Sequence, residues 1–252
     1  MTRSFLITGA SRGIGRAVAL HFAALGGEIH LLGRDEAALA TVAEEVAAAG
    51  GKAHLHAASV TDRVALRAVS ARIPRLDGVV AAAGISGVTP VDSDSLEVDE
   101  AFDSILLTDL TGCWNTVRAF APKLGEGGRI VLVSSVLGRF GVPGYGAYCA
   151  AKHGLLGLTK ALALELISKG IYVNAVAPGW VDTAMAQTGI RAMAQSMDTS
   201  EEEARRIAEE AVPVQRFFQP EEIAHGIAWL MDPANTMQVG QCLNLDGGVV
   251  QI

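Results

Sequence analysis

The chain has 252 residues, of which 50% are hydrophobic, so it can bury a sizeable core, and a disordered or linker-like protein is excluded. A net charge of −7 offers no basic footprint for a phosphate backbone, so we expect no nucleic-acid partner. The three cysteines, Cys113, Cys149 and Cys242, are widely spaced and form no CxxC pair, which favours a reducing compartment.

The first residues run directly into an apolar strand pattern, without the basic region, apolar stretch and cleavage site of an export signal. Every apolar run is interrupted before it reaches the roughly 18 residues that a bilayer-spanning helix needs. We therefore expect a soluble, cytoplasmic protein with no membrane partner.

Short β-branched and apolar runs alternate with longer stretches of helical periodicity along the whole chain. Strands are expected at residues 5–8, 28–32, 52–56, 77–83, 129–134, 171–176 and 241–245. Helices are expected at residues 13–25, 35–49, 62–73, 98–124, 147–168 and 220–231. Runs such as 78–83 lack in/out alternation, which is typical of strands buried on both faces of a parallel sheet. The predicted fold class is α/β: one Rossmann-type domain, residues 1–252, with a doubly wound parallel sheet of about seven strands and helices on both faces.

One irregular, Met-rich segment, residues 183–213, interrupts this alternation. Within it, Thr199-Ser200-Glu201-Glu202-Glu203 has the spacing of a helix N-terminus with a capping box. We expect this segment to be a mobile helical flap beside the substrate.

A glycine-rich turn, Thr8-Gly9-Ala10-Ser11-Arg12-Gly13-Ile14-Gly15, follows the first strand. Glycines at such a turn let the backbone approach a pyrophosphate held at a helix N-terminus. Alone, the turn could equally be a structural connection between strand and helix.

Tyr148 and Lys152 are four residues apart on a predicted helix, so their side chains project from the same face. A cation beside a phenol favours the phenolate and makes tyrosine a usable acid or base near neutral pH. Ser135 follows a predicted buried strand and is expected at the same ligand-binding edge of the sheet. A Tyr and a Lys at this spacing are, by themselves, commonly a solvated helix pair.

Together, the TGxxxGIG turn, the serine, the YxxxK pair and the later Asn174-Ala175-Val176-Ala177-Pro178-Gly179 resemble the short-chain dehydrogenase/reductase family along essentially the whole chain. The resemblance implies that Ser135 orients the substrate oxygen and Tyr148 transfers a proton. It implies that Lys152 lowers the pKa of Tyr148 and holds the nicotinamide ribose. The residues expected to bind the cofactor are Gly9, Ser11, Arg12, Gly13, Ile14, Gly15, Arg34, Ser59, Val60, Ala83, Gly84, Tyr148, Lys152, Pro178, Gly179, Val181 and Thr183.

Three positions depart from the family pattern. The stretch Ala81-Ala82-Ala83-Gly84 replaces the usual Asn-Asn-Ala-Gly and loses side-chain hydrogen bonds that brace the sheet. Asp109 stands where the family's fourth catalytic residue is Asn, whose main-chain carbonyl serves a water relay to the lysine. Asp109 is kept as a candidate catalytic residue and is also expected to perturb Lys152. Ser59 replaces an Asp that commonly binds adenine, and its hydroxyl is expected to substitute.

Cofactor choice depends on the residues after the second strand, where a carboxylate would bind the ribose hydroxyl of NAD and an arginine would accept the phosphate of NADP. The chain has Arg34 there, and Arg12 in the glycine turn offers a second cation. Asp35 is interpreted as the N-cap of the next helix. NADP(H) is favoured, with NAD(H) as the alternative.

No metal site is predicted. His54 and His56 alternate on one strand, but the sequence pattern supplies no third ligand. The remaining histidines, His30 among them, are expected to serve packing or to lie at the surface.

The expected function is NADP(H)-dependent reduction of a ketone to a secondary alcohol. The substrate would be a 3-oxoacyl thioester or a polyketide-like ketone, as in the acyl-thioester ketoreductases that the chain resembles. The candidate apolar side chains for the walls of the substrate pocket are Leu137, Tyr145, Trp180, Met185 and Met193, with core packing as the alternative role. The cations available to meet a carrier protein are Arg129, Arg139 and Arg191. A dehydrogenase of a cyclic or small secondary alcohol and a catalytically silent nucleotide-binding regulator are the alternative functions.

A homotetramer is also expected, mainly from the family resemblance. The apolar stretches 101–124 and 154–166 and the apolar end 249–252 would form its interfaces.

Overall fold

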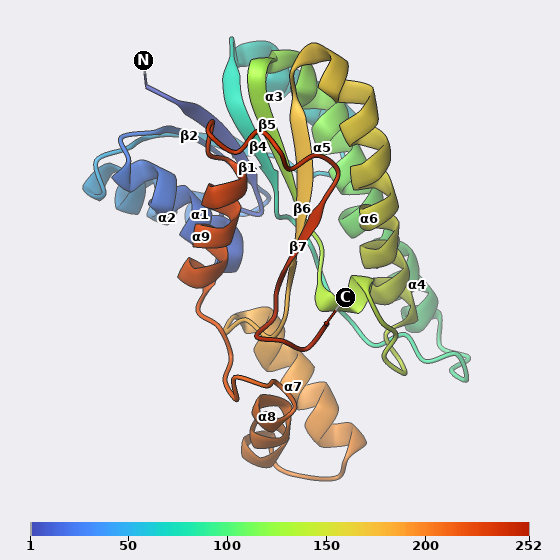
Figure 1. Cartoon of the computed structure of the whole chain (residues 1–252). Helices are drawn as coiled ribbons and strands as arrows, with labels where there is room; N and C mark the ends of the chain where they lie inside the picture. The colour runs from blue at the N-terminus through green and yellow to red at the C-terminus, as the bar shows by residue number, and fades with distance from the viewer. Residues whose placement is uncertain (1, 252) are drawn as a thin grey trace.

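The computed structural model describes residues 2–251, which form a seven-stranded parallel sheet in the order β3-β2-β1-β4-β5-β6-β7 (Figure 1). Met1 and Ile252, at the ends of the predicted domain, lie outside the described residues. The strands are β1 (Ser4–Thr8), β2 (Glu28–Gly33), β3 (Lys52–Ala57), β4 (Leu76–Ala81), β5 (Leu124–Val133), β6 (Tyr172–Pro178) and β7 (Cys242–Leu245). The predicted α/β fold class is confirmed.

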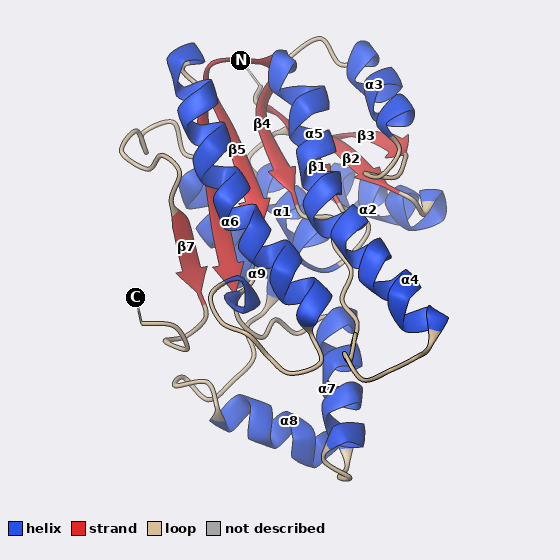
Figure 2. Cartoon of the chain, turned by 90° about the vertical axis from the view of Figure 1, so that its right-hand side faces the viewer, coloured by secondary structure: helices blue, strands red, loops and turns tan. Residues whose placement is uncertain are grey.

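Helices cover both faces of the sheet (Figures 1 and 2). Helices α1 (Gly13–Ala24), α2 (Glu36–Ala48) and α9 (Pro220–Leu230) pack on one face. Helices α3 (Arg63–Arg72), α5 (Gly112–Phe120) and α6 (Gly146–Leu166) pack on the other. Side chains alternate between the two cores even on buried strands, so Phe5 and Ile7 belong to the first and Leu6 to the second.

The strand order reverses between β1 and β4, because the chain builds β2 and β3 on one side of β1 and then crosses to the other. Parallel sheets of this kind hold ligands in the crevice beyond the carboxyl ends of the strands at such a reversal. The glycine turn after β1, Arg34 after β2 and Ser135 shortly after β5 all lie at that edge.

The predicted helix 98–124 is wrong as a single element. The chain instead forms α4 (Leu96–Ile105), a π-helical turn (Leu106–Thr111), α5, and a 3₁₀ turn (Ala121–Lys123), and β5 already begins at Leu124. A π turn inserts extra chain without breaking the apolar pattern, so hydrophobic periodicity does not reveal it. Such turns are frequent at functional sites, and this one carries Asp109.

The flap segment contains two helices, α7 (Ala184–Ser196) and α8 (Glu201–Glu210). They pack on each other through a small core of their own that includes Ile190, Ala204 and Phe217, and they project beyond the carboxyl edge of the sheet (Figure 1). The helix predicted from the capping spacing is α8, whose N-cap Ser200 Oγ accepts a hydrogen bond from the Glu203 amide at 3.1 Å. Across residues 2–251, no helix has the length and apolar character to cross a membrane.

Candidate active site

The predicted serine, tyrosine and lysine come together at the carboxyl edge of the sheet. Tyr148 and Lys152 lie one turn apart on α6, and the Lys152 ammonium is 5.3 Å from the centre of the Tyr148 ring. Ser135 lies just beyond β5, close enough to Tyr148 for its hydroxyl to act against the rise in the pKa of Tyr148. Ser135 Oγ also accepts the Leu137 amide at 3.1 Å, which fixes the serine rotamer.

Asp109 is fully buried and forms an ion pair with Lys152, with Oδ2 3.0 Å from Nζ. Its other oxygen accepts the Ile85 amide at 2.8 Å, and Lys152 Nζ also donates to the Val133 carbonyl at 3.1 Å. The Asp109 side chain therefore connects the turn after β4 to the lysine, so the bracing function of the family's asparagine is retained by a different side chain.

Burial and neighbouring charges have opposing effects on the pKa values of Lys152 and Tyr148. Burial is the largest single influence on Lys152 and lowers its pKa, but Asp109, Tyr148 and Cys113 together outweigh burial and raise the pKa of Lys152 above its usual range. Burial also raises the pKa of Tyr148, with Asp109 adding to the rise and Lys152 and Ser135 opposing it. The lysine thus acts on the tyrosine in the predicted direction, but the net pKa of Tyr148 is raised. A raised pKa keeps Tyr148 protonated at neutral pH, the form that can donate a proton.

The alanine-rich turn after β4 is braced from β1 rather than by its own side chains. Thr8 Oγ1 accepts hydrogen bonds from the Ala82 and Ala83 amides, both at 3.1 Å. Thr8, on β1, therefore holds this turn in place without the family's asparagine side chains.

A cleft of about 580 Å³ opens at the strand-order reversal. Predicted cofactor residues that line it are Gly9, Ser11, Arg12, Gly13, Ile14, Gly15, Arg34, Ser59, Val60, Ala83, Gly84 and Thr183. Lining residues that sequence reasoning missed include Arg16, Ile85, Ser86, Thr108 and Asp182. Each of them lies within two residues of a predicted site residue, so proximity to those motifs along the chain was the signal that could have found them.

Five predicted cofactor residues are not among those that line this cleft. Tyr148 and Lys152 belong to the catalytic cluster described above. Pro178, Gly179 and Val181 support the turn that carries Thr183: the Gly179 amide donates to the Leu245 carbonyl at 3.0 Å, and Val181 forms an isolated bridge with Phe218.

The glycine turn has the shape that a dinucleotide cofactor requires. Gly9 has a φ of +66°, and a Cβ there would lie 2.8 Å from the Ala83 Cα. A Cβ on Gly15 would lie 2.3 Å from the Gly9 carbonyl oxygen. A side chain at either position would collide with the chain's own backbone, so glycine is required for the turn to fold this tightly. The tight turn leaves the start of α1 at the wall of the cleft, where a cofactor phosphate would be held, so the residues present fit such a cofactor.

The residues predicted after β2 and β3 lie at the wall of the cleft. Arg34 and Arg12 are exposed and line the cleft, free of any carboxylate contact within the described chain. Asp35 Oδ1 accepts the Ala38 amide at 3.0 Å, so it caps α2 as predicted. Ser59 Oγ lies 2.8 Å from Thr61 Oγ1, at the cleft wall.

Three of the five candidate side chains for the substrate pocket fall into two groups. Met185 lines the cleft, whereas Trp180 and Met193 pack on the flap core, with Trp180 stacked on Phe217 at 5.0 Å. Of the arginines considered for contact with a carrier protein, Arg129 is not available, because β5 carries it into the interior, where it is 2% exposed and lies against the Tyr172 ring. Arg191 is paired with Glu201 at 3.7 Å.

Comparisons with known proteins agree with this geometry. The family model described as enoyl-(acyl carrier protein) reductase matches residues 9–250. The chain is 34% identical over 254 residues to the 3-oxoacyl-[acyl-carrier-protein] reductase FabG of Thermotoga maritima, covering 97% of this chain and 96% of that protein. It is 38% identical over 251 residues to the 3-oxoacyl-[acyl-carrier-protein] reductase of Synechocystis sp., covering 97% and 96%. The chain belongs to the short-chain dehydrogenase/reductase family.

A solved structure of this family extends the match to three dimensions. The crystal structure of an actinorhodin polyketide ketoreductase variant with NADPH superposes with a TM-score of 0.89 at 32% identity, covering 98% of this chain and 97% of that chain. The protein is thus an oxidoreductase of the short-chain dehydrogenase/reductase family.

Proposed function

We propose that this protein reduces the ketone of a 3-oxoacyl thioester or a polyketide-like substrate to a secondary alcohol, using NADPH. The observation that carries the proposal is the cluster of Ser135, Tyr148 and Lys152 beside a cleft shaped for a dinucleotide. Relatives named as 3-oxoacyl-[acyl-carrier-protein] reductases, and a polyketide ketoreductase of the same fold, support the substrate class.

The bound cofactor supplies the hydride that reduces the carbonyl carbon. In the proposed reaction, the Ser135 hydroxyl donates a hydrogen bond to the ketone oxygen and orients it. Tyr148 then transfers its phenolic proton to that oxygen as negative charge develops there. Lys152, kept protonated by Asp109, stabilises the phenolate that Tyr148 becomes. The Lys152 ammonium would also donate a hydrogen bond to the ribose of the bound cofactor.

The experiment that tests the proposal compares kcat/KM for an acetoacetyl thioester and for simple cyclic ketones, with NADPH in excess. We expect the thioester to be the better substrate. A cyclic ketone reduced with clearly higher kcat/KM would point instead to a dehydrogenase of cyclic alcohols. NADPH binding without turnover of any ketone would point to a nucleotide-binding regulator.

Arg34 and Arg12 are proposed to select NADPH over NADH. Charge-assisted hydrogen bonds to the 2′-phosphate contribute about 1.5–3 kcal/mol, which corresponds to roughly ten- to hundredfold tighter binding of NADPH. We expect Arg34→Asp to erase most of this preference by weakening NADPH binding, as measured by titration of each dinucleotide. Arg67→Asp, the same charge change at an exposed position on α3, is the matched control and should leave the ratio unchanged. Equal dissociation constants for both dinucleotides in the unmodified protein would contradict the assignment.

We also propose that the protein assembles as a homotetramer. Exposed apolar side chains support this proposal, because Leu107, Trp114 and Leu164 on the two candidate interface stretches are 48%, 36% and 76% exposed in the isolated chain. Light scattering at micromolar concentration should give four times the chain mass, and a monomeric mass would contradict the proposal.

A cytoplasmic location is proposed as well. Its support is that Cys113, Cys149 and Cys242 are all free thiols. Cell fractionation with an epitope-tagged chain tests it, and recovery of the protein from an exported fraction would contradict it.

A further inference from the structure

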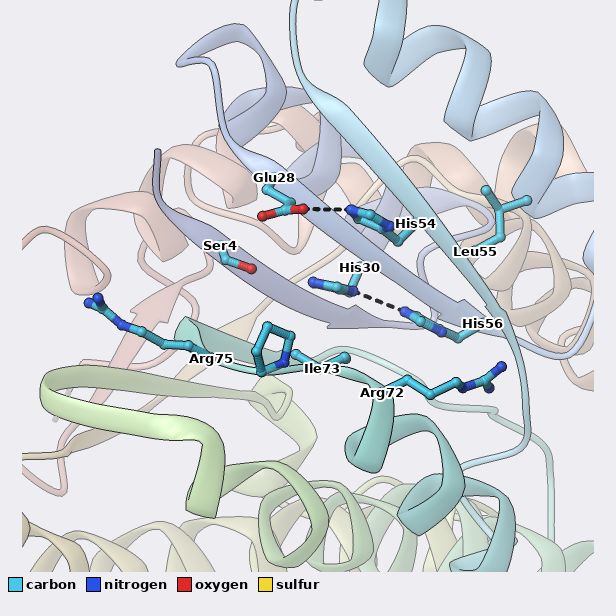
Figure 3. A pocket seen from close by; sticks show the side chains of 10 residues that line it. Ser4, Glu28, His30, His54, Leu55, His56, Arg72, Ile73 and Arg75 are labelled. Atoms are coloured by element: carbon cyan, nitrogen blue, oxygen red, sulfur yellow. Dashed lines mark hydrogen bonds and ion pairs between the residues drawn. The ribbon is translucent and has the colours of Figure 1, made fainter. Parts of the chain in front are cut away.

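Three histidines and a glutamate gather on β2 and β3 (Figure 3), and none of them lines the active-site cleft. Glu28 and His30 lie on β2, and His54 and His56 lie on the adjacent β3, where His30 is in register with His54. Strand alternation puts all four side chains on the face of the sheet that α3 covers. The sequence pattern offered only His54 and His56, and strand pairing supplies the other two.

The polar atoms of this cluster converge. His54 Nε2 lies 2.6 Å from Glu28 Oε1, and His30 Nδ1 lies 3.0 Å from His56 Nε2 (Figure 3). One ligand atom from each of Glu28, His30 and His54 lies within 4.8 Å of the other two. Zinc bonds of about 2.0–2.2 Å in a tetrahedral site place neighbouring ligand atoms about 3.4 Å apart, so small side-chain rotations suffice to surround an ion.

The surrounding cavity provides a second, independent observation. It has a volume of about 280 Å³ and is lined by the four residues of the cluster together with Ser4, Ile73 and Arg75, among others. Ser4 Oγ, in this lining, is buried and has no hydrogen-bond partner within the described part of the chain. A buried hydroxyl without a partner is costly, and a water bound to a metal ion would satisfy it.

Positive charges near the cluster oppose cation binding, but one of these side chains can turn into solvent and another is neutralised by a carboxylate. Lys52 Nζ lies 3.1 Å from Glu28 Oε1, yet its side chain is 70% exposed and can move into solvent. Arg75 is paired with Asp77 at 2.7 Å. Arg72, which lines the cavity beside His56, remains the main opposing charge.

We propose that Glu28, His30 and His54 form a binding site for a divalent transition-metal ion of the zinc type, with water as the fourth ligand. Two imidazoles and one carboxylate are a donor set that zinc prefers, and the donors come from a rigid, paired section of two strands. The contact between His56 Nε2 and His30 Nδ1 orients the His30 ring, as hydrogen-bond partners of metal-bound histidines commonly do. The site would tie edge strand β3 to β2 and has no part in hydride transfer.

Calorimetric titration of the metal-free protein with Zn²⁺ tests the proposal. We expect one ion to bind per chain, and the melting temperature to rise by roughly 5 °C or more at a hundredfold excess of Zn²⁺ over Kd. Glu28→Gln and His54→Gln should each weaken binding at least tenfold. His153→Gln, which removes an exposed histidine on α6, is the matched control and should leave the Kd unchanged.

The melting temperature of each metal-free variant shows whether it folds, and Glu28→Gln is the safer variant because Glu28 is only partly buried. Absence of Zn²⁺ binding at micromolar concentrations would overturn the proposal. Unchanged affinity in both Glu28→Gln and His54→Gln would also overturn it, because the ion would then be bound elsewhere, for example by a cysteine.

Discussion

Replacing Tyr148 by phenylalanine is expected to lower kcat for ketone reduction by roughly a hundred- to ten-thousandfold, the range in which a positioned acid or base contributes. The substitution removes only the phenolic hydroxyl, which is the sole donor in the proposed proton transfer. The Tyr148 ring remains in place beside Lys152, so the packing of α6 should persist. Steady-state kinetics with NADPH and an acetoacetyl thioester measures the effect.

NADPH titration of the Tyr148→Phe variant is the control. The cleft formed by the glycine turn, Arg34 and Thr183 is untouched, so Kd for NADPH should change by less than about threefold, or 0.7 kcal/mol. A variant that binds NADPH normally and still reduces the thioester at the original rate would remove Tyr148 from the mechanism. Tyr145→Phe, which changes a neighbouring tyrosine by the same atom, should leave kcat within a few-fold.

The fold and the relative placement of Tyr148 and Lys152 were predictable because each depends on a short-range pattern. Buried parallel strands read as uninterrupted apolar runs, and a four-residue spacing on a helix fixes the relative directions of Tyr148 and Lys152. The glycine turn is likewise local, since Gly9 and Gly15 are required by contacts with the chain's own backbone.

Features that depend on long-range contacts were not predictable. The ion pair of Asp109 with Lys152 requires the π turn between α4 and α5, which leaves no mark in the hydrophobic pattern. The convergence of Glu28 and His30 with His54 depends on the register between two strands that are 24 residues apart at Glu28 and Lys52. In the flap, Ala186, Ile190 and Ala194 form an apolar stripe at four-residue spacing on α7, but the stripe packs on α8 and Phe217 instead of on the sheet, which the spacing alone does not reveal.

The ion pair between Asp109 and Lys152 makes a second strong prediction, on stability. Replacing Lys152 by methionine leaves a fully buried carboxylate whose remaining protein contact is the Ile85 amide. Breaking a buried pair in this way typically costs about 3–5 kcal/mol, so the midpoint of urea denaturation should fall sharply. The double variant Lys152→Met with Asp109→Leu removes both charges and should recover most of that free energy, because two apolar side chains of similar volume replace the pair.

Catalysis should not recover with stability in this double variant, since Lys152 is proposed to stabilise the tyrosyl phenolate. The separation of the two readouts distinguishes the proposed catalytic role of Lys152 from its contribution to stability. Asp109→Asn keeps Lys152 and restores the family's usual residue, so it tests the effect of the Asp109 charge itself. Asp109 raises the pKa of Tyr148, so its neutralisation should lower that pKa. Reduction needs protonated Tyr148, and the alkaline limb of the pH profile of kcat/KM should therefore move to lower pH in Asp109→Asn. A limb that stays in place, or a Lys152→Met variant as stable as the unmodified protein, would show that the carboxylate does not act on the catalytic lysine and tyrosine.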